Sequence, residues 1–334
     1  MKVRIIAEAG VNHNGDFYRA KEMIDVAASC GADYVKFQSF SAEKLVTKLA
    51  PKAPYQVSEM RKNESQFQML ERLELSEEQI VQLKLHANMR SIGFLSTAFD
   101  IENLKLLDSI GQTIFKIPSG EINNLPYLRQ VGNLGKPIIM STGMASLEEV
   151  EIALNVLLEV GAKKEQITIL HCTSAYPAPY MDVNLLAMQT MRSRFGVAVG
   201  YSDHTLGTEV AIAAVAMGAK VIEKHFTLDR ELPGPDHKSS LEPEELHSMI
   251  KAIRHIEISL GDGIKRLTSS EKMNVEISRK SIVARKRIEK GCVFTESLLT
   301  TKRPGTGISP MRWDSLIGRK ASRNYEIDEM IDES

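Results

Sequence analysis

Eight short runs of apolar, largely β-branched residues are the feature of this 334-residue chain that most restricts its fold. A segment of helical length and amphipathic pattern follows most of them, and such segments are expected at residues 16–30, 100–110, 146–160, 207–217 and 242–259. Strands that alternate with helices form βα units around a parallel sheet. The runs are RIIAEAG from Arg4, YVKFQ from Tyr34, GFLSTA from Gly93, IFKIPS from Ile114, KPIIMST from Lys136, ITILHCT from Ile167, GVAVGYSD from Gly196 and KVIEKHFT from Lys220.

Two parallel architectures can be built from such units, a closed (β/α)8 TIM barrel and an open, doubly wound sheet. Eight alternations within roughly 230 residues match the size of a closed barrel. An open sheet that binds a dinucleotide would carry a G-x-G-x-x-G sequence after a strand, and none of the eight runs is followed by one. Polar residues also stand at the ends of all eight runs. The pattern therefore predicts a TIM barrel of the α/β class.

The βα rhythm stops after about residue 265, which marks a second domain. Short strand-like pieces, SIVARKRI and SLLTTKR, follow among Gly and Pro turns. We predict a barrel domain over residues 1–265 and a small β-rich domain over residues 279–334. A domain of that size has a small core, so we expect it to pack against the barrel or against another subunit.

Charge and cysteine content exclude several classes of protein. Lys and Arg total 42 against 43 Asp and Glu, so no positive excess is available for nucleic acid or an anionic membrane. The three cysteines are too few and too widely spaced for a disulfide framework, which favours a reducing compartment. Glu8 interrupts the first apolar run, and no apolar stretch approaches the about 18 residues of a membrane span. We expect a cytoplasmic protein.

One long connection, residues 39–66, follows the second predicted strand and carries Lys48, Lys52, Tyr55 and Gln56. Barrel enzymes bind substrates at the face where strands end, so this segment is interpreted as a lid over the site. An Ω-loop that only covers the barrel mouth is the alternative.

Polar and charged residues gather at the ends of the predicted strands. A charge that points into a barrel is costly unless a ligand or a counter-charge compensates it. Taken singly, such a lysine indicates an interior salt bridge, and a serine or threonine indicates a helix cap. Their convergence on one rim indicates a binding site. The set comprises Glu8, Lys36, Gln38, Ser96, Thr97, Lys116, Ser119, Glu121, Ser141, Thr142, Thr173, Ser174, Tyr176, Ser202, Asp203, His204, Glu223 and His225.

The two lysines of this rim, Lys36 and Lys116, indicate the charge of its ligand. Two cations with several hydroxyl and loop N–H donors suit a small molecule that bears both a phosphate and a carboxylate, because each oxygen takes a charge-assisted hydrogen bond. Phosphoenolpyruvate has that shape. The rim is therefore predicted to bind phosphoenolpyruvate.

Two histidines, His204 and His225, end neighbouring predicted strands and could share one divalent cation. Glu8, Glu223 or Asp236 would then supply a nearby carboxylate or an outer-shell partner. Two histidines with no metal role are the alternative. A metal there would act as a Lewis acid on an aldehyde oxygen.

Ten stretches, in order along nearly the whole chain, resemble the sialic acid synthases. That family comprises N-acetylneuraminate synthase and the bacterial relatives that make legionaminic and pseudaminic acids. The resemblance implies a (β/α)8 barrel followed by a small antifreeze-like (SAF) domain. The stretches are AEAGVNHNGD, VKFQSF, FLSTAFD, FKIPSGEINNLPYL, MSTGMAS, LHCTSAYPAP, VGYSDHT, IEKHFTLD, GPDHKSSLEP and KRPGTGISP.

The resemblance also implies roles for individual residues. Those expected to hold phosphoenolpyruvate are Lys36, Thr97, Lys116, Ser119, Ser141, Ser174 and Ser202. Those expected to face the sugar are Glu8, Gln38, Tyr176, Glu223 and Asp236. Mn2+ is the expected ion on His204 and His225, with Mg2+ and Co2+ as alternatives. Ser174 stands where some N-acetylneuraminate synthases have Asn, and this shorter donor would rely on water.

A partner subunit is implied as well. Arg303, in KRPGTG, corresponds to the arginine that the family lends across a domain-swapped homodimer to the N-acetyl group of the substrate. Without the resemblance, Arg303 would be interpreted as an exposed surface residue.

The implied reaction joins phosphoenolpyruvate to an acetamido sugar. Its C3 attacks the aldehyde of the open-chain sugar, water adds at C2, and phosphate leaves by C–O cleavage. Glu8, Lys36 and Glu121 are the candidate catalytic residues, with Glu121 as the candidate for proton transfer. We expect N-acetylneuraminate as the product from N-acetylmannosamine. The alternative is N,N'-diacetyllegionaminate, from 2,4-diacetamido-2,4,6-trideoxymannose.

Two rivals belong to different classes. A Schiff-base aldolase would use Lys36 or Lys116 as its nucleophile, and borohydride trapping with pyruvate would reveal it. A non-catalytic carbohydrate-binding or ice-binding protein is the other rival. The polar rim argues against it, because a binding protein has no need of a metal pair beside a phosphate site.

Overall fold

The computed structural model describes residues 2–52 and 64–333, and the chain divides into two compact units, Met1–Gly261 and Asp262–Ser334. Two residues of the predicted lid, Tyr55 and Gln56, lie outside the described residues. Among the described residues, no helix is both long and apolar enough to cross a membrane.

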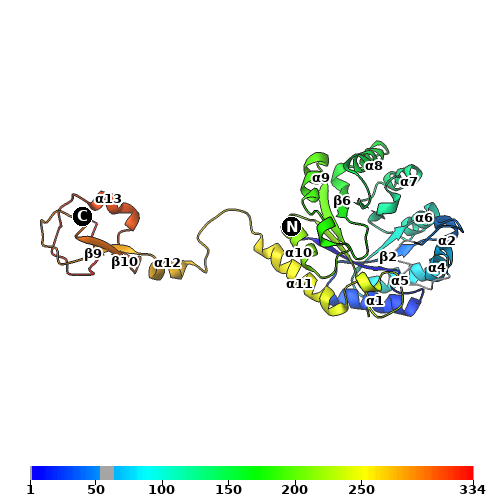
Figure 1. Ribbon diagram of the computed structural model, residues 1–334, viewed down its shortest axis with the longest axis horizontal. Coiled ribbons are helices and arrows are strands. Elements are labelled where there is room, and N and C mark those ends of the chain that lie inside the picture. Colours follow the sequence, from blue (N-terminus) through cyan, green and yellow to red (C-terminus); the bar gives the residue numbers. More distant parts are fainter. Residues whose placement is uncertain (1, 53–63, 334) are drawn as a thin grey trace. The chain divides into compact units, whose positions relative to one another are not determined.

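The first unit is built on a sheet of parallel strands (Figure 1). The strand order in this sheet is β3-β2-β1-β8-β7-β6-β5-β4. The first strand pairs with both the second and the last, and the two end strands of this order, β3 and β4, lie next to each other. The sheet therefore curls round on itself, as the predicted TIM barrel requires. The strands are β1 (Arg4–Gly10), β2 (Tyr34–Ser39), β3 (Gly93–Ala98), β4 (Phe115–Ile117), β5 (Ile138–Ser141), β6 (Ile167–Cys172), β7 (Ala198–Asp203) and β8 (Val221–His225).

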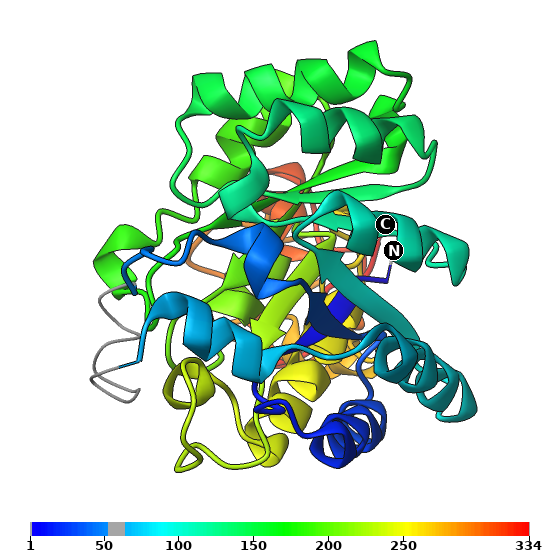
Figure 2. The ribbon, with the colours of Figure 1, turned by 90° about the vertical axis from the view of Figure 1, so that its right-hand side faces the viewer.

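Helices surround these strands (Figure 2), and local signals set their ends. The last helix of the unit begins with Pro243 in its first turn and a capping box between Glu242 and Glu245. All five helices predicted from the sequence are present. The helices are α1 (Phe17–Cys30), α2 (Ala42–Leu45), α4 (Gln66–Leu73), α5 (Glu77–Met89), α6 (Ile101–Ser109), α7 (Leu125–Asn133), α8 (Leu147–Glu159), α9 (Ala187–Phe195), α10 (Glu209–Ala216) and α11 (Pro243–Ser259). Single 3-10 turns are η1 (Ser119–Glu121), η2 (Lys164–Gln166), η3 (Tyr180–Asp182) and η4 (His237–Ser239).

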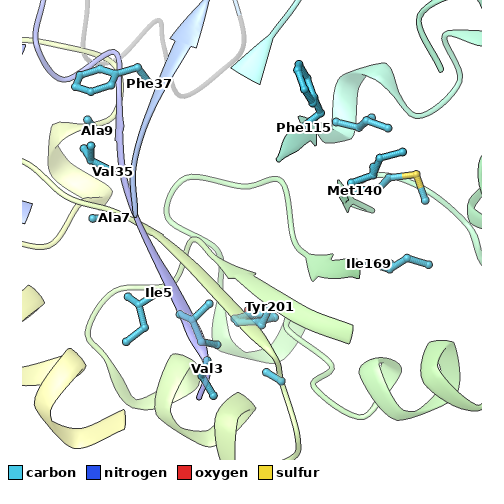
Figure 3. Packing of buried hydrophobic residues seen from close by; sticks show 14 of the residues in the cluster. Val3, Ile5, Ala7, Ala9, Val35, Phe37, Phe115, Met140, Ile169 and Tyr201 are labelled. Atoms are coloured by element: carbon cyan, nitrogen blue, oxygen red, sulfur yellow. The ribbon is translucent and has the colours of Figure 1, made fainter. Parts of the chain in front are cut away.

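Alternating side chains give the strands two different faces. The outward face packs under the helices in the main core, part of which Figure 3 shows with Val35, Phe37, Ile169 and Tyr201. The inward face begins with a separate apolar layer: Ile6, Leu95, Ile114, Ile139, Leu170 and Val221. Two residues further along the same strands comes a layer that is almost entirely polar: Glu8, Lys36, Thr97, Lys116, Ser141, Cys172, Ser202 and Glu223. The apolar layer is thus the floor beneath the polar one.

The second unit has its own small core and matches the predicted β-rich domain in character. Its two strands pair antiparallel, and Ile282, Phe294, Leu299 and Tyr325 are among its buried residues. Isolated bridges extend the strand-like pairing, as between Ile288 and Tyr325. The elements are α12 (Lys272–Ser278), β9 (Ser281–Ala284), β10 (Leu299–Lys302), η5 (Pro310–Arg312) and α13 (Trp313–Leu316).

Leu170→Ala is expected to lower the free energy of unfolding by about 2–5 kcal/mol, because it opens a cavity in the apolar floor of the barrel. Leu170 is fully buried, whereas Leu85 on α5 is 58% exposed and makes a matched control. Urea denaturation of Leu170→Ala and Leu85→Ala measures both effects. Equal, small losses in the two variants would show that the floor does not carry the barrel's stability.

Candidate active site

Four buried charges meet inside the barrel above its apolar floor. The Lys36 Nζ lies 2.8 Å from the Glu8 Oε2 and 3.6 Å from the Glu223 Oε2. The Lys116 Nζ lies 3.3 Å from the Glu223 Oε1. All four side chains are at most 7% exposed. Two lysines and two glutamates from β1, β2, β4 and β8 therefore form one charged cluster, which we call the charged layer.

Hydroxyl and amide groups add hydrogen bonds to this charged layer. Lys36 donates to the Thr97 Oγ1 at 2.9 Å, and the Ser202 hydroxyl donates to the Glu223 Oε1 at 3.0 Å. The Gln38 side chain donates to the Glu8 Oε1 at 3.4 Å. Among the described residues, the buried Ser141 hydroxyl has no hydrogen-bond partner. A buried hydroxyl without a partner is costly, so Ser141 is a donor available to a ligand.

Burial and the neighbouring charges shift the pKa values of the two glutamates in opposite directions. Burial raises the pKa of Glu8 to about 7, although Lys36 opposes the shift. Burial also acts to raise the pKa of Glu223, but Lys116 and Lys36 outweigh it and lower the pKa to about 2. Burial lowers the pKa of Lys116, whereas for Lys36 the two glutamates outweigh burial and raise the pKa. Glu223 is thus the firm counter-charge, and Glu8 is the carboxyl that can exchange a proton near neutral pH.

Beside the charged layer, three loops converge on Gly143. The Gly143 N–H donates to the Ser119 Oγ at 3.0 Å. A Cβ on this glycine would lie 2.1 Å from the Ser174 Oγ, 2.9 Å from the Ser119 Oγ and 3.2 Å from the Cys172 Sγ. The missing side chain therefore lets one backbone donor and two hydroxyls from different loops share a small space. This group of donors suits the oxygens of a phosphate.

Sequence reasoning missed both Gly143 and Cys172. Cys172 is buried, with its Sγ 3.7 Å from the His204 Nδ1 and 3.8 Å from the Ser119 Oγ. Two signals could have found them. Cys172 lies two positions after the inward-facing Leu170, and Gly143 directly follows the residues singled out at the end of the fifth strand, Ser141 and Thr142.

Two histidines and a tyrosine pack together next to the charged layer. The His204 and His225 ring centroids are 5.6 Å apart, and the Tyr176 ring lies 4.3 Å from the first and 5.8 Å from the second. The His204 Nδ1 lies 2.8 Å from the Thr173 carbonyl oxygen and therefore carries a proton, so Nε2 has a free lone pair when the ring is neutral. In the described part of the chain, the buried His225 Nδ1 has no hydrogen-bond partner, and it lies 3.8 Å from the Asp236 Oδ2.

These imidazoles fit a divalent cation. Burial lowers the pKa of His225 well below its usual value, so this ring is the neutral form that binds metals. Within residues 2–52 and 64–333 no group of three or more His, Cys, Asp or Glu side chains is arranged to hold a metal. A cation here would therefore take nitrogen ligands from the two histidines and complete its coordination with water or substrate oxygens.

The structure does not join every predicted site residue to this cluster. Glu121 shares the turn η1 with Ser119, but its carboxylate accepts from the Asn124 amide at 2.5 Å. In the part of the chain that the structure describes, no hydrogen bond or ion pair links Glu121 to the charged layer. Arg303 belongs to the second unit, where its Nε donates to the Ser278 carbonyl at 2.9 Å. In the predicted lid, Lys52 lies 3.8 Å from Glu64.

Comparison with known proteins shows the family to which this chain belongs. The NeuB family model matches residues 23–265, and the SAF domain model matches residues 279–334. The chain belongs to the NeuB family. The predicted resemblance to sialic acid synthases is thereby confirmed, as is the order of a barrel and a SAF domain.

Named relatives of this NeuB-family chain cover nearly its full length. It is 55% identical to an N,N'-diacetyllegionaminic acid synthase of Campylobacter jejuni, over 99% of both chains. It is 47% identical to the Legionella pneumophila protein of the same name, over 96% of this chain and 90% of that one. The crystal structure of an N-acetylneuraminic acid synthetase from Leptospira borgpetersenii, in complex with citrate, superposes with a TM-score of 0.73 at 36% identity. That match covers 83% of this chain and 91% of the other.

Lys116→Met is expected to weaken phosphoenolpyruvate binding by at least about tenfold, because it removes a charge-assisted donor and leaves Glu223 with one lysine fewer. Isothermal titration calorimetry measures this affinity directly. Lys136→Met, at a lysine that pairs with Asp108 and is 34% exposed, is the matched control. Equal affinity of both variants for phosphoenolpyruvate would show that Lys116 does not bind this ligand.

Proposed function

We propose that this chain condenses phosphoenolpyruvate with an acetamido sugar and releases phosphate. The observation that carries this proposal is the charged layer, in which Lys36 and Lys116 lie buried at the barrel rim beside Gly143 and its neighbouring hydroxyls. Buried lysines in such a place serve an anionic ligand, and phosphoenolpyruvate presents a phosphate and a carboxylate to them. Membership of the NeuB family supports the same reaction.

The residues of this site divide between the two substrates in the proposal. The phosphoenolpyruvate side comprises Lys36, Thr97, Lys116, Ser119, Ser141, Ser174 and Ser202. Gly143 adds its backbone N–H to that side. The sugar side comprises Glu8, Gln38, Tyr176, Glu223 and Asp236. Charged and hydroxyl donors are already held in place by mutual hydrogen bonds, so little reorganisation is needed when the substrates bind.

A divalent cation held by His204 and His225 would polarise the aldehyde oxygen of the sugar, with Mn2+ as the expected ion. Tyr176 packs against both imidazole rings and limits how far they can turn. Asp236 would accept a hydrogen bond from the sugar beside His225.

Two features argue against a Schiff-base aldolase. A lysine nucleophile must lose its proton, and the two glutamates beside Lys36 raise its pKa. Lys116 has a lowered pKa, yet Glu223 holds it in an ion pair. Both lysines are therefore better suited to hold an anion than to attack a carbonyl.

Of the two products considered from the sequence, N,N'-diacetyllegionaminate is favoured over N-acetylneuraminate. The two relatives named as N,N'-diacetyllegionaminic acid synthases share more residues with this chain than the N-acetylneuraminic acid synthetase structure does. The sugar would then be 2,4-diacetamido-2,4,6-trideoxymannose. We further propose a domain-swapped homodimer, in which Arg303 of each SAF domain reaches the partner's barrel and contacts the N-acetyl group.

Incubation with phosphoenolpyruvate and Mn2+ is expected to yield N,N'-diacetyllegionaminate from 2,4-diacetamido-2,4,6-trideoxymannose, at a kcat/KM at least about tenfold above that for N-acetylmannosamine. Mass spectrometry of parallel reactions identifies each product. A preference for N-acetylmannosamine would select N-acetylneuraminate instead. Phosphate release with neither sugar would reject the condensation.

Glu121→Gln is expected to lower kcat by at least about a hundredfold while leaving phosphoenolpyruvate binding measurable, if Glu121 transfers the proton. Glu8→Gln is the informative comparison, because Glu8 has the raised pKa and contacts Lys36 directly. Steady-state kinetics with calorimetry of phosphoenolpyruvate binding separate the two effects. Near-normal turnover of Glu121→Gln would reject that role and leave Glu8 as the proton-transfer candidate.

A further inference from the structure

A second buried ion pair lies on the outward face of the strands that carry the two histidines. The Lys224 Nζ is 2.7 Å from the Asp203 Oδ2, and their side chains are 1% and 0% exposed. The two residues are register partners between β7 and β8. His204 directly follows Asp203, and His225 directly follows Lys224. Each residue of the ion pair therefore directly precedes one of the two histidines in the sequence, and its side chain lies on the opposite face of the sheet.

Further hydrogen bonds extend this pair around His204. The Lys224 ammonium also donates to the Thr205 carbonyl oxygen at 2.7 Å. The Asp203 Oδ1 accepts from the Thr205 N–H at 2.9 Å and from its hydroxyl at 2.8 Å. His204 thus stands between two residues that are both tied to the Lys224 side chain. The backbone of β8 and the turn after β7 are locked to each other through one ammonium group.

The main effect of this ion pair is to fix the relative position of two strands, and its contribution to stability is small. Moving two charges out of water is costly, and well-packed apolar residues of similar size often stabilise a protein as much as a buried pair does. Asp203 and Lys224 also point away from the barrel interior, so they do not touch the proposed substrates. Their shared effect is to fix where β7 ends relative to β8, and hence the spacing of the imidazoles that follow them.

We propose that Asp203 and Lys224 are a positioning pair that sets the spacing of His204 and His225 for a divalent cation. The inference rests on the metal site of the proposed function. Partners that orient metal ligands from outside the coordination shell commonly change metal affinity by about 10- to 100-fold when they are removed. Loss of this pair should therefore weaken metal binding more than phosphoenolpyruvate binding, because the two lysines of the anion site stand on other strands, β2 and β4.

The test uses the double variant Asp203→Asn/Lys224→Met, which removes both charges together and so avoids a lone buried charge. The Asn side chain keeps an oxygen for Thr205, and Met fills the space of the lysine stem. Mn2+ affinity is measured from the electron paramagnetic resonance signal of free Mn2+, and phosphoenolpyruvate affinity by calorimetry. We expect Mn2+ binding at least about tenfold weaker, with a clearly smaller loss of phosphoenolpyruvate affinity.

Asp33→Asn/Arg254→Met is the matched control, because these side chains form a half-buried ion pair 2.6 Å long at the other end of the barrel strands. It should lower thermal stability without changing Mn2+ affinity. Unchanged Mn2+ affinity in the folded Asp203→Asn/Lys224→Met protein would overturn the positioning role, as would an equal loss in the control. If the unaltered protein binds no Mn2+, the proposed metal site fails and this inference fails with it, whereas product formation tests the condensation separately.

Discussion

Charge compensation inside the barrel is the interaction on which the candidate site depends. Alternation along the strands turns Glu8, Lys36, Lys116 and Glu223 inward, directly above a layer of apolar side chains. None of these charges could stay buried alone, because an isolated ion in an apolar interior loses its hydration. Their mutual pairing lets the barrel hold two lysines ready for an anion, where a closed core would otherwise contain only hydrocarbon.

The same alternation separates the side chains of the candidate site, which point inward, from those that hold the strands in place, which point outward. Inward residues near the strand ends line the candidate site, and outward residues between them pack against the surrounding helices or pair with each other. Asp203 and Lys224 belong to the second group, as do the apolar side chains under the helices. Small residues matter where the inward side is most crowded, as at Gly143, where a methyl group would displace the hydroxyls around it. Binding and positioning are thus assigned to opposite faces of single strands.

The structure changes which residue is the better candidate for proton transfer. Glu121 shares a turn with Ser119 but is held by Asn124, away from the hydrogen bonds of the charged layer. Glu8 is inside that layer, and burial raises its pKa to about 7. A carboxyl that titrates near neutrality beside a lysine can both accept and return a proton. The geometry therefore favours Glu8 over Glu121 for proton transfer, whereas the sequence had favoured Glu121.

The sequence by itself predicted the barrel, five of its helices and most of the polar residues on the rim. Those features follow from local periods of two and about 3.6 residues, which are visible along the chain. Tertiary structure alone decided which charges pair, because Lys36 and Glu223 are far apart in the sequence, on the two strands that flank β1, and no local pattern encodes their distance. It also decided that Gly143 and Cys172 adjoin Ser119, and that Asp203 lies against Lys224. Such contacts depend on how the strands close on one another, which only the folded barrel specifies.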